Sequence, residues 1–168
     1  SRDAVFVPSF SAVSSDRYLY ARAFSLIHAE QDPVRGRRVV QAHPKSLIIQ
    51  NPPSRPLSTA ELDRVYELPF SRKAHPLYRE RIPALEPVQF SVVTHRGCFG
   101  NCSFCALSHH QGCIIQSRSI PSLVREVQRM AKMPEFRGVV QDVGGPTANM
   151  YAMSCPGWET RGTCPDRN

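Results

Sequence analysis

The fold is decided by one stretch of the chain, Val88-Gln89-Phe90-Ser91-Val92-Val93-Thr94-His95-Arg96-Gly97-Cys98-Phe99-Gly100-Asn101-Cys102-Ser103-Phe104-Cys105. Its first seven residues are rich in β-branched and aromatic side chains, which is typical of a buried β-strand. Its last eight residues carry three cysteines with the spacing C-x3-C-x2-C, so one tight loop after the strand supplies three thiolates. An iron–sulfur cube usually takes four cysteine thiolates, one for each iron. A local set of three therefore leaves one iron for another ligand.

A helix and a second strand are predicted to follow this loop. Ser119 is expected to cap a helix that runs to about Met133, with an apolar stripe made of Leu123, Val124, Val127, Met130 and Ala131. Residues 139–143 predict a short strand that ends at Gly144-Gly145-Pro146. Strand, helix and strand form a βαβ unit, which we expect to be parallel and right-handed. Because chemistry in such folds gathers at the carboxyl ends of the strands, the cysteine loop and the Gly-Gly-Pro loop are expected to face one ligand.

The residues before Val88 predict short elements separated by prolines. The chain of 168 residues contains 15 prolines, against an average usage of roughly 5%. We expect strands at residues 4–10 and 46–50 and a helix at residues 16–30 capped by Ser14 or Ser15. Ser58-Thr59-Ala60-Glu61 is a capping box that predicts another short helix. Residues 66–87 and 154–168 are expected to be irregular.

Composition narrows the class of protein. The net charge is +7 and the isoelectric point about 9.4, but the densest basic run, Arg35-Gly36-Arg37-Arg38, has no interleaved aromatic residues on which bases could stack. A solvated basic face is therefore favoured over a nucleic-acid site. No apolar run approaches the ~20 residues that span a bilayer, so we expect no membrane partner. Six cysteines without a secretory signal indicate a reducing compartment, the cytoplasm.

Two other readings of the cysteine loop remain open from the spacing alone. Zinc takes four ligands, commonly as two pairs, and a fourth ligand could come from His95, His109, His110 or Cys113. This alternative is a zinc-stabilised binding module without catalysis, although a second pair of ligands is missing. A thiol redox centre at Cys102 and Cys105 leaves Cys98 without a role. Cys113, Cys155 and Cys164 are assigned no function.

The loop resembles the signature of radical S-adenosylmethionine (SAM) enzymes, C-x3-C-x-Φ-C with Φ aromatic. Cys98, Cys102, Phe104 and Cys105 match it position for position. Other stretches resemble the YgiQ-type radical SAM proteins, namely Arg96-Gly97-Cys98-Phe99-Gly100, Ile114-Ile115-Gln116-Ser117-Arg118-Ser119, Gly144-Gly145-Pro146-Thr147-Ala148-Asn149-Met150-Tyr151, Val7-Pro8-Ser9-Phe10, Asn51-Pro52-Pro53 and Pro56-Leu57-Ser58-Thr59.

The resemblance implies a cofactor set and a reaction. Cys98, Cys102 and Cys105 would ligate three irons of a [4Fe-4S] cluster, and SAM would chelate the fourth. One electron, from a donor such as flavodoxin or ferredoxin, would cleave SAM reductively to a 5′-deoxyadenosyl radical that takes hydrogen from an unknown substrate. The protein would supply placement and exclusion of water, and no side chain is assigned a catalytic step of its own.

The resemblance also implies which residues contact these cofactors. Gly144, Gly145 and Pro146 occupy the place of a Gly-Gly-Glu-like stretch that contacts the methionine part of SAM. Proline replaces the acidic residue, so Asp142 is a candidate to substitute for it. Phe104 is expected to shield one side of the site. Gln116 and Arg118 are expected to contact the carboxylate of SAM or the edge of the cluster.

The implied fold class is α/β. Residues 1–86 would be the end of an α/β amino-terminal region, residues 87–153 the start of a radical SAM partial (β/α) barrel with its cluster loop, and residues 154–168 an irregular tail. A barrel of about six β/α units needs on the order of 200 residues. We therefore expect a truncated chain that is inactive as an isolated fragment.

Overall fold

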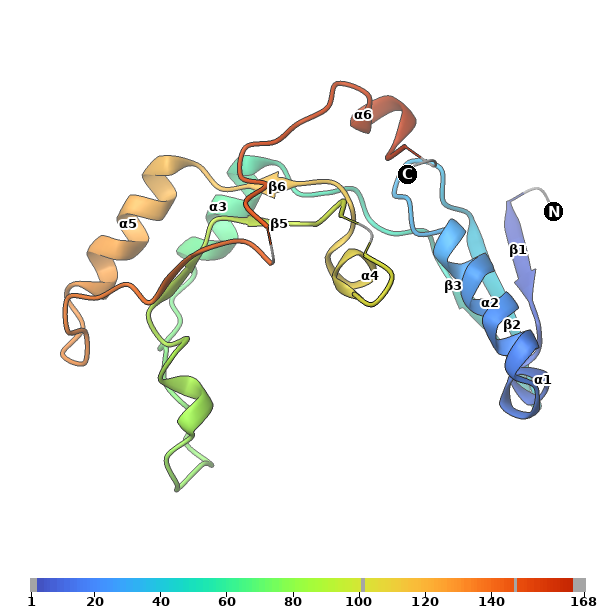
Figure 1. Cartoon of the computed structure of the whole chain (residues 1–168), viewed down its shortest axis with the longest axis horizontal. Helices are drawn as coiled ribbons and strands as arrows, with labels where there is room; N and C mark the ends of the chain where they lie inside the picture. Colours follow the sequence, from blue (N-terminus) through green and yellow to red (C-terminus); the bar gives the residue numbers. More distant parts are fainter. Residues whose placement is uncertain (1–2, 101, 147, 165–168) are drawn as a thin grey trace. The chain divides into compact units, whose positions relative to one another are not determined.

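The computed structural model describes residues 3–100, 102–146 and 148–164. Helices and strands are interspersed along the chain, so the fold class is α/β as predicted (Figure 1). The chain divides into two compact units built from separate segments, residues 1–56, 99–114 and 154–168 in unit 1 and residues 57–98 and 115–153 in unit 2. The division passes through the cysteine loop, because Cys98 ends a segment of unit 2 and Cys102 and Cys105 belong to unit 1. Among the described residues, no helix is long and apolar enough to cross a membrane.

Unit 1 contains a three-stranded mixed sheet. Its strands are β1 (Ala4–Val7), β2 (Arg38–His43) and β3 (Ser46–Gln50), in the order β1-β2-β3. β1 runs parallel to β2, and β3 runs antiparallel to it. The predicted strand at residues 46–50 is confirmed, whereas the one at 4–10 ends at Val7 because Ser9 already caps a helix. The central strand β2 was not predicted.

Two helices replace the single helix expected at residues 16–30. They are α1 (Phe10–Ser15) and α2 (Arg17–Ala29), and the N-cap of α2 is Asp16, whose carboxylate accepts from the N–H groups of Tyr18 and Leu19 at 2.7 and 3.1 Å. The predicted cap at Ser14 or Ser15 is wrong. Both hydroxyls bond back to carbonyl groups inside α1, Ser14 to Phe10 at 2.7 Å and Ser15 to Ser11 at 3.1 Å. They are therefore not available to the next helix.

The core of unit 1 lies between the inner face of α2 and the sheet. Ala23 on α2 is buried against Val7 of β1 and Val39 of β2, and the side chains packed around them are Val13, Leu26 and Ile27. The unit also contains α4 (Leu107–Gln111) and α6 (Trp158–Arg161). Part of the segment expected to be irregular is thus a short helix, and residues 165–168 lie outside the described residues.

Two buried carboxylates fasten the turn that connects α2 to β2. Glu30 accepts three hydrogen bonds from the Arg37 side chain, and it also accepts from the Arg37 N–H at 2.8 Å. Asp32 accepts from the N–H groups of Val34 and Thr163 at 2.9 and 2.7 Å and from the Thr163 hydroxyl at 2.8 Å. Burial alone would raise the pKa of the Asp32 carboxyl, but these hydrogen bonds lower it from 3.8 to about 2.

The replacement Asp32→Asn is expected to lower the free energy of unfolding by about 2 kcal/mol at pH 7. Because the pKa of Asp32 is lower in the folded chain, its stabilisation is complete above about pH 4 and is lost as the pH falls through about 2. Urea denaturation of both proteins at several pH values measures the difference. A difference that stays constant down to the lowest pH would contradict the role of the charge.

Unit 2 holds the predicted βαβ unit. Strands β4 (Ser91–Val93) and β7 (Asp142–Gly144) pair in parallel, with Ser91 opposite Asp142, and α5 (Ile120–Met130) lies between them in sequence. Both strands are shorter than the predicted 88–94 and 139–143. Residues 86–90 form turns after the 3-10 helix Pro83–Leu85, so regular pairing begins only at Ser91. Ser119 caps α5 as predicted, by accepting from the Ser122 N–H.

Short elements complete unit 2. The predicted capping box is present at the start of α3 (Thr59–Glu67), with Ser58 and Glu61 bonded reciprocally. β5 (His95–Arg96) pairs antiparallel with β6 (Gln116–Ser117). The apolar core consists of Phe90, Val92 and Met130, surrounded by Leu123, Val127, Met133, Phe136 and Val140.

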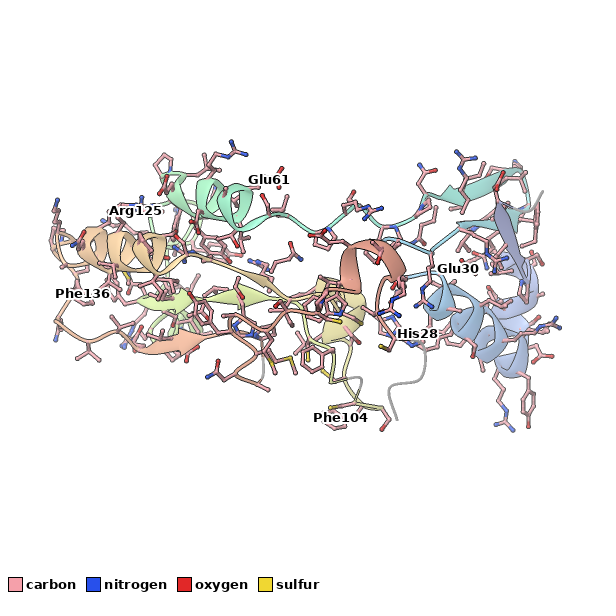
Figure 2. The ribbon with its side chains drawn as sticks, turned by 90° about the horizontal axis from the view of Figure 1, so that it is seen from above. His28, Glu30, Glu61, Phe104, Arg125 and Phe136 are labelled. Carbon is pink, nitrogen blue, oxygen red and sulfur yellow. The ribbon has the colours of Figure 1, made fainter. Side chains whose placement is uncertain are left out.

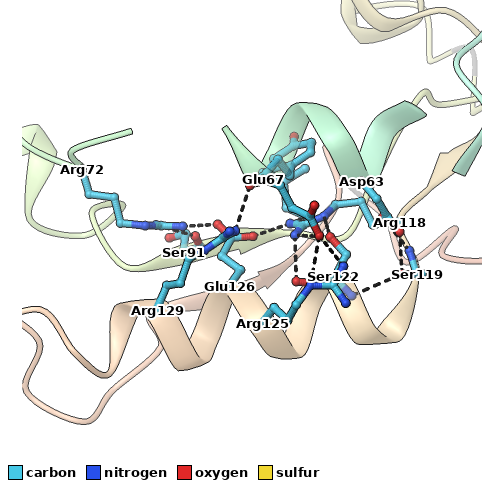
Figure 3. Close-up of polar contacts among 12 residues, drawn as sticks. Asp63, Glu67, Arg72, Ser91, Arg118, Ser119, Ser122, Arg125, Glu126 and Arg129 are labelled. Carbon is cyan, nitrogen blue, oxygen red and sulfur yellow. Dashed lines mark hydrogen bonds and ion pairs between the residues drawn. The ribbon is translucent and has the colours of Figure 1, made fainter. Parts of the chain in front are cut away.

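A buried ion network joins α5 to β4 (Figure 3). The Glu126 carboxylate pairs with both Arg72 and Arg118, and the side chains of these three residues are 3, 8 and 0% exposed. Arg118 also donates to the Val93 carbonyl at 3.0 Å, and Arg72 to the Ser91 carbonyl at 3.0 Å. The predicted apolar stripe of α5 is therefore only partly right, because Glu126 and Ser122 are buried while Val124 is 49% exposed.

The replacement Glu126→Gln is expected to lower the free energy of unfolding by about 3–5 kcal/mol, because it leaves two arginines buried without a counter-charge. Urea denaturation followed by far-UV circular dichroism measures the loss. The matched control is Glu86→Gln, because the pair of Glu86 with Arg81 is exposed on both sides and should contribute at most about 1 kcal/mol. Equal effects of the two replacements would show that the burial of Glu126 does not matter.

Candidate functional site

The cysteine loop begins at the carboxyl end of the parallel strand pair. The Thr94 N–H donates to the Gly144 carbonyl at 2.8 Å, so the chain leaves β4 directly beside the end of β7. Gly97 follows β5 with φ of 91°, a left-handed conformation that favours glycine. Cys98 comes next and is buried. The prediction that the cysteine loop and the Gly-Gly-Pro loop start at the same edge of the sheet is thus confirmed.

The second part of the loop lies in unit 1. The Cys105 N–H donates to the Cys102 carbonyl at 2.9 Å, which closes a tight turn just before α4. Cys102 is exposed and Cys105 is half-buried. Both cysteines line an open cavity of about 570 Å³, together with Phe24, His28, Ser103, Phe104, Ala106 and His109. Two of the three predicted ligands therefore share one cavity.

Helix α2 contributes the opposite wall of this cavity. The ring of His109 on α4 lies 5.2 Å from the ring of Phe24 and 4.7 Å from that of His28, centroid to centroid. Burial lowers the pKa of His109, and the neighbouring His28 and His110 lower it further. The sequence analysis named His109 only as a candidate fourth ligand of zinc, and it missed Phe24 and His28. Nothing in the sequence marks them, since an i, i+4 pair of rings on a helix is common.

A second cavity, of about 430 Å³, lies in unit 2 at the end of β7. It is lined by Thr94, Asp142, Val143, Gly144, Gly145, Ala148, Asn149 and Tyr151. The Tyr151 hydroxyl donates to the Arg118 carbonyl at 2.8 Å, which fixes one side of this cavity. The cavity thus holds both glycines of the Gly-Gly-Pro loop together with the Asp142 carboxylate, in a mainly polar surrounding.

The His95 side chain packs directly against Gly145 of the Gly-Gly-Pro loop. Its side chain is buried, with Nδ1 2.9 Å from Thr94 Oγ1. Burial lowers the pKa of His95, and a hydrogen bond with the Ala148 backbone opposes this in part. A Cβ atom added at Gly145 would overlap the imidazole of His95, whereas one at Gly144 would meet only Asp142 Oδ1 at 3.7 Å. Glycine is therefore required at position 145 and not at position 144.

The replacement Gly145→Ala is expected to lower the free energy of unfolding by about 1–3 kcal/mol, because the His95 ring must move out of its buried position. Gly144→Ala is the matched control and is expected to change stability by much less. Urea denaturation of the two variants measures both values. If Gly144→Ala is as destabilising as Gly145→Ala, the contact with His95 is not the cause.

The remaining predicted residues fall in different places. Arg118 does not face either cavity, because its side chain is buried against Ser122 and Glu126, and the expectation that it contacts a cofactor is wrong. Gln116 Oε1 accepts from the Leu57 N–H at 2.9 Å. Phe104 is 90% exposed, and Figure 2 shows it at the outer end of the loop. Asn101 and Thr147, which belong to the two motifs, lie outside the described residues.

The donor set of the loop suits an iron–sulfur cluster. None of the six cysteines, all of which lie in the described ranges, forms a disulfide. Cysteine thiolates are the ligands that such clusters use. Two of the three signature cysteines, the exposed Cys102 and the half-buried Cys105, line one cavity. Within residues 3–100, 102–146 and 148–164, however, no three His, Cys, Asp or Glu side chains are gathered closely enough to hold a single metal ion.

Comparison with known proteins identifies the family of the chain. Residues 1–91 match the family model described as radical SAM N-terminal. The chain therefore belongs to the radical SAM family. The matched segment ends inside β4, so the cysteine loop lies just beyond it.

The similar proteins extend the match over the cysteine loop. The chain is 55% identical to a UPF0313 protein of Methanosarcina mazei over 166 residues, 99% of this chain and 26% of that protein. It is 52% identical to a UPF0313 protein of Methanocella arvoryzae over 165 residues, 98% of this chain and 28% of that protein. A UPF0313 protein of Clostridium botulinum is 46% identical over 168 residues, 99% of this chain and 26% of its own length.

The chain spans about a quarter of the length of these curated relatives. No solved structure matches it.

Proposed function

We propose that this chain carries the cofactor-binding part of a radical SAM enzyme. Cys98, Cys102 and Cys105 hold three irons of a [4Fe-4S] cluster, and SAM completes the coordination of the fourth. The observation that carries the proposal is the cavity shared by Cys102 and Cys105, in a chain that belongs to the radical SAM family. A cluster held there, once reduced by an external electron donor, would supply the one electron needed to cleave SAM reductively to methionine and a 5′-deoxyadenosyl radical.

The polar cavity at the end of β7 is the proposed site for the methionine part of SAM. Gly144 and Gly145 leave their backbone groups accessible there, and no side chain other than hydrogen fits at Gly145. Pro146 offers neither an N–H group nor a carboxylate. The Asp142 carboxylate lines the same cavity and would pair with the ammonium group of SAM. This assignment makes Asp142 the substitute for the acidic residue that the motif lacks.

The proposed protein environment keeps water and oxygen from the reacting groups. Phe104 is the aromatic residue of the signature, and its side chain is 90% exposed. Because the described parts of the chain leave its ring uncovered, the ring would be free to pack against bound SAM or the cluster. The unit β4–α5–β7 would be the first β/α unit of a partial barrel, with the methionine part of SAM at its carboxyl edge. The substrate, an electron donor such as flavodoxin or ferredoxin and a cytoplasmic location belong to the same proposal.

Anaerobic reconstitution with iron and sulfide is expected to load about four irons per chain and to give a broad visible absorption. Cys102→Ala is expected to abolish most of this absorption, because the cluster loses a ligand. Cys113→Ala is the matched control: it removes a cysteine outside the signature and should leave the iron content unchanged. One bound zinc with neither iron nor sulfide would favour the zinc-stabilised binding module instead.

The role of Asp142 is tested on the loaded protein. Addition of SAM is expected to change the electron paramagnetic resonance spectrum of the reduced cluster, because a new ligand reaches one iron. Asp142→Asn should raise the SAM concentration needed for this change at least several-fold. Asp16→Asn removes the same charge at the cap of α2, where asparagine caps equally well, and should have no effect on SAM binding.

A further inference from the structure

Two faces of helix α2 contact different parts of unit 1. Ala23, with the neighbouring Leu26 and Ile27, packs against the sheet and forms the core of unit 1. Phe24 and His28, one helical turn apart, lie on another face and line the cavity of Cys102 and Cys105. Figure 2 shows His28 on this helix, and the helix and residues 99–114 belong to the same unit. The second face thus belongs to the cysteine cavity and not to the core.

Phe24 and His28 on this face are not part of the apolar core of unit 1. Phe24 is 51% exposed and makes ring contacts with His28 at 6.2 Å and with His109 at 5.2 Å. Among the residues that the structure describes, no Asp, Glu, Lys or Arg side chain lines the cavity. The described surface opposite the two thiols is therefore aromatic, made by Phe24, His28 and His109. Such a surface limits the access of water to whatever the thiols hold.

We propose that α2 is the outer wall of the iron–sulfur site, with Phe24 and His28 as positioning residues that cover the side of the cluster held by Cys102 and Cys105. This inference rests on the proposed function and adds a part of the site that the cysteine signature does not contain. The wall comes from residues about 75 positions before the loop, within the segment that matches the radical SAM N-terminal family. The amino-terminal segment then tunes the cluster in addition to packing its own core.

Solvent exposure is one of the properties that set the potential and the lifetime of a cluster. The reduced cluster carries one more negative charge than the oxidised one, and water stabilises charge. Removal of the Phe24 ring should therefore raise the reduction potential. It should also open a path for chelators to the irons.

The test compares Phe24→Ala and His28→Ala with Tyr18→Ala in reconstituted protein. Tyr18 is a 73% exposed ring on the same helix, is not among the residues that line the cavity, and is the matched control. Phe24→Ala is expected to lose its cluster to a chelator several-fold faster and to show a higher midpoint potential. Phe24→Tyr keeps the ring and should behave as the unmodified chain does. If Phe24→Ala matches Tyr18→Ala in both measurements, the wall does not exist.

A second measurement needs no cluster. Phe24 and the half-buried Cys105 line the same cavity of the cluster-free chain. Phe24→Ala should therefore widen the access to Cys105 and raise the rate of its alkylation several-fold, as mapped by mass spectrometry. Alkylation of Cys113 should stay constant. If Phe24→Ala does not fold, His28→Ala decides the question, because His28 lies outside the core. Failure of the unmodified chain to take up iron and sulfide overturns the proposed function, whereas unchanged alkylation of Cys105 overturns the wall alone.

Discussion

The buried Glu126 carboxylate is the interaction on which unit 2 depends. It lies between two arginines that come from different parts of the chain, Arg72 before β4 and Arg118 before α5. Both guanidinium groups also donate to carbonyl groups of β4, at Ser91 and Val93. A buried charge of this kind is costly unless each partner is satisfied. The network therefore fixes α5 over β4 in one position, and the strand end that leads to Cys98 is fixed with it.

A second set of contacts connects this ion network to the polar cavity at the end of β7. Asp63 of α3 accepts from the Ser119 N–H at 3.0 Å, and the Arg118 guanidinium lies 4.2 Å from the Tyr66 ring centroid. These contacts hold the start of α5 against α3. The Arg118 carbonyl then accepts from Tyr151, which lines the polar cavity. The residue that sequence reasoning assigned to cofactor contact thus acts as a structural support behind the cavity.

The sequence was sufficient for features that depend on near neighbours. Residues 46–50, the capping box at Ser58 and the cap at Ser119 were predicted correctly, because each is encoded within a few residues. The parallel pairing of β4 with β7 followed from the strand–helix–strand order. The cysteine and Gly-Gly-Pro motifs were found from spacing and resemblance. Each of these signals is local or carried by chain order.

The failures have a common physical cause, which is dependence on partners distant in sequence. Glu126 has one partner eight residues earlier, Arg118, but its second partner, Arg72, comes 54 residues earlier, so the sequence around Glu126 does not show that it is buried. The strand β2 was missed because the parallel neighbour that it pairs with, β1, lies more than 30 residues earlier, with Ala4 opposite Arg38. Phe24 and the His95–Gly145 contact are likewise visible only once the chain is folded.

The link between Asp32 and Thr163 has a consequence for biosynthesis. These residues are 131 positions apart, and a ribosome that adds about 5–20 residues per second needs on the order of ten seconds to cover that span. In the later part of this interval the nascent chain contains all three signature cysteines while the Asp32 carboxylate still lacks its last two donors. Iron and sulfide delivered at this stage would meet an amino-terminal unit in which the hydrogen bonds from Thr163 to Asp32 have not yet formed.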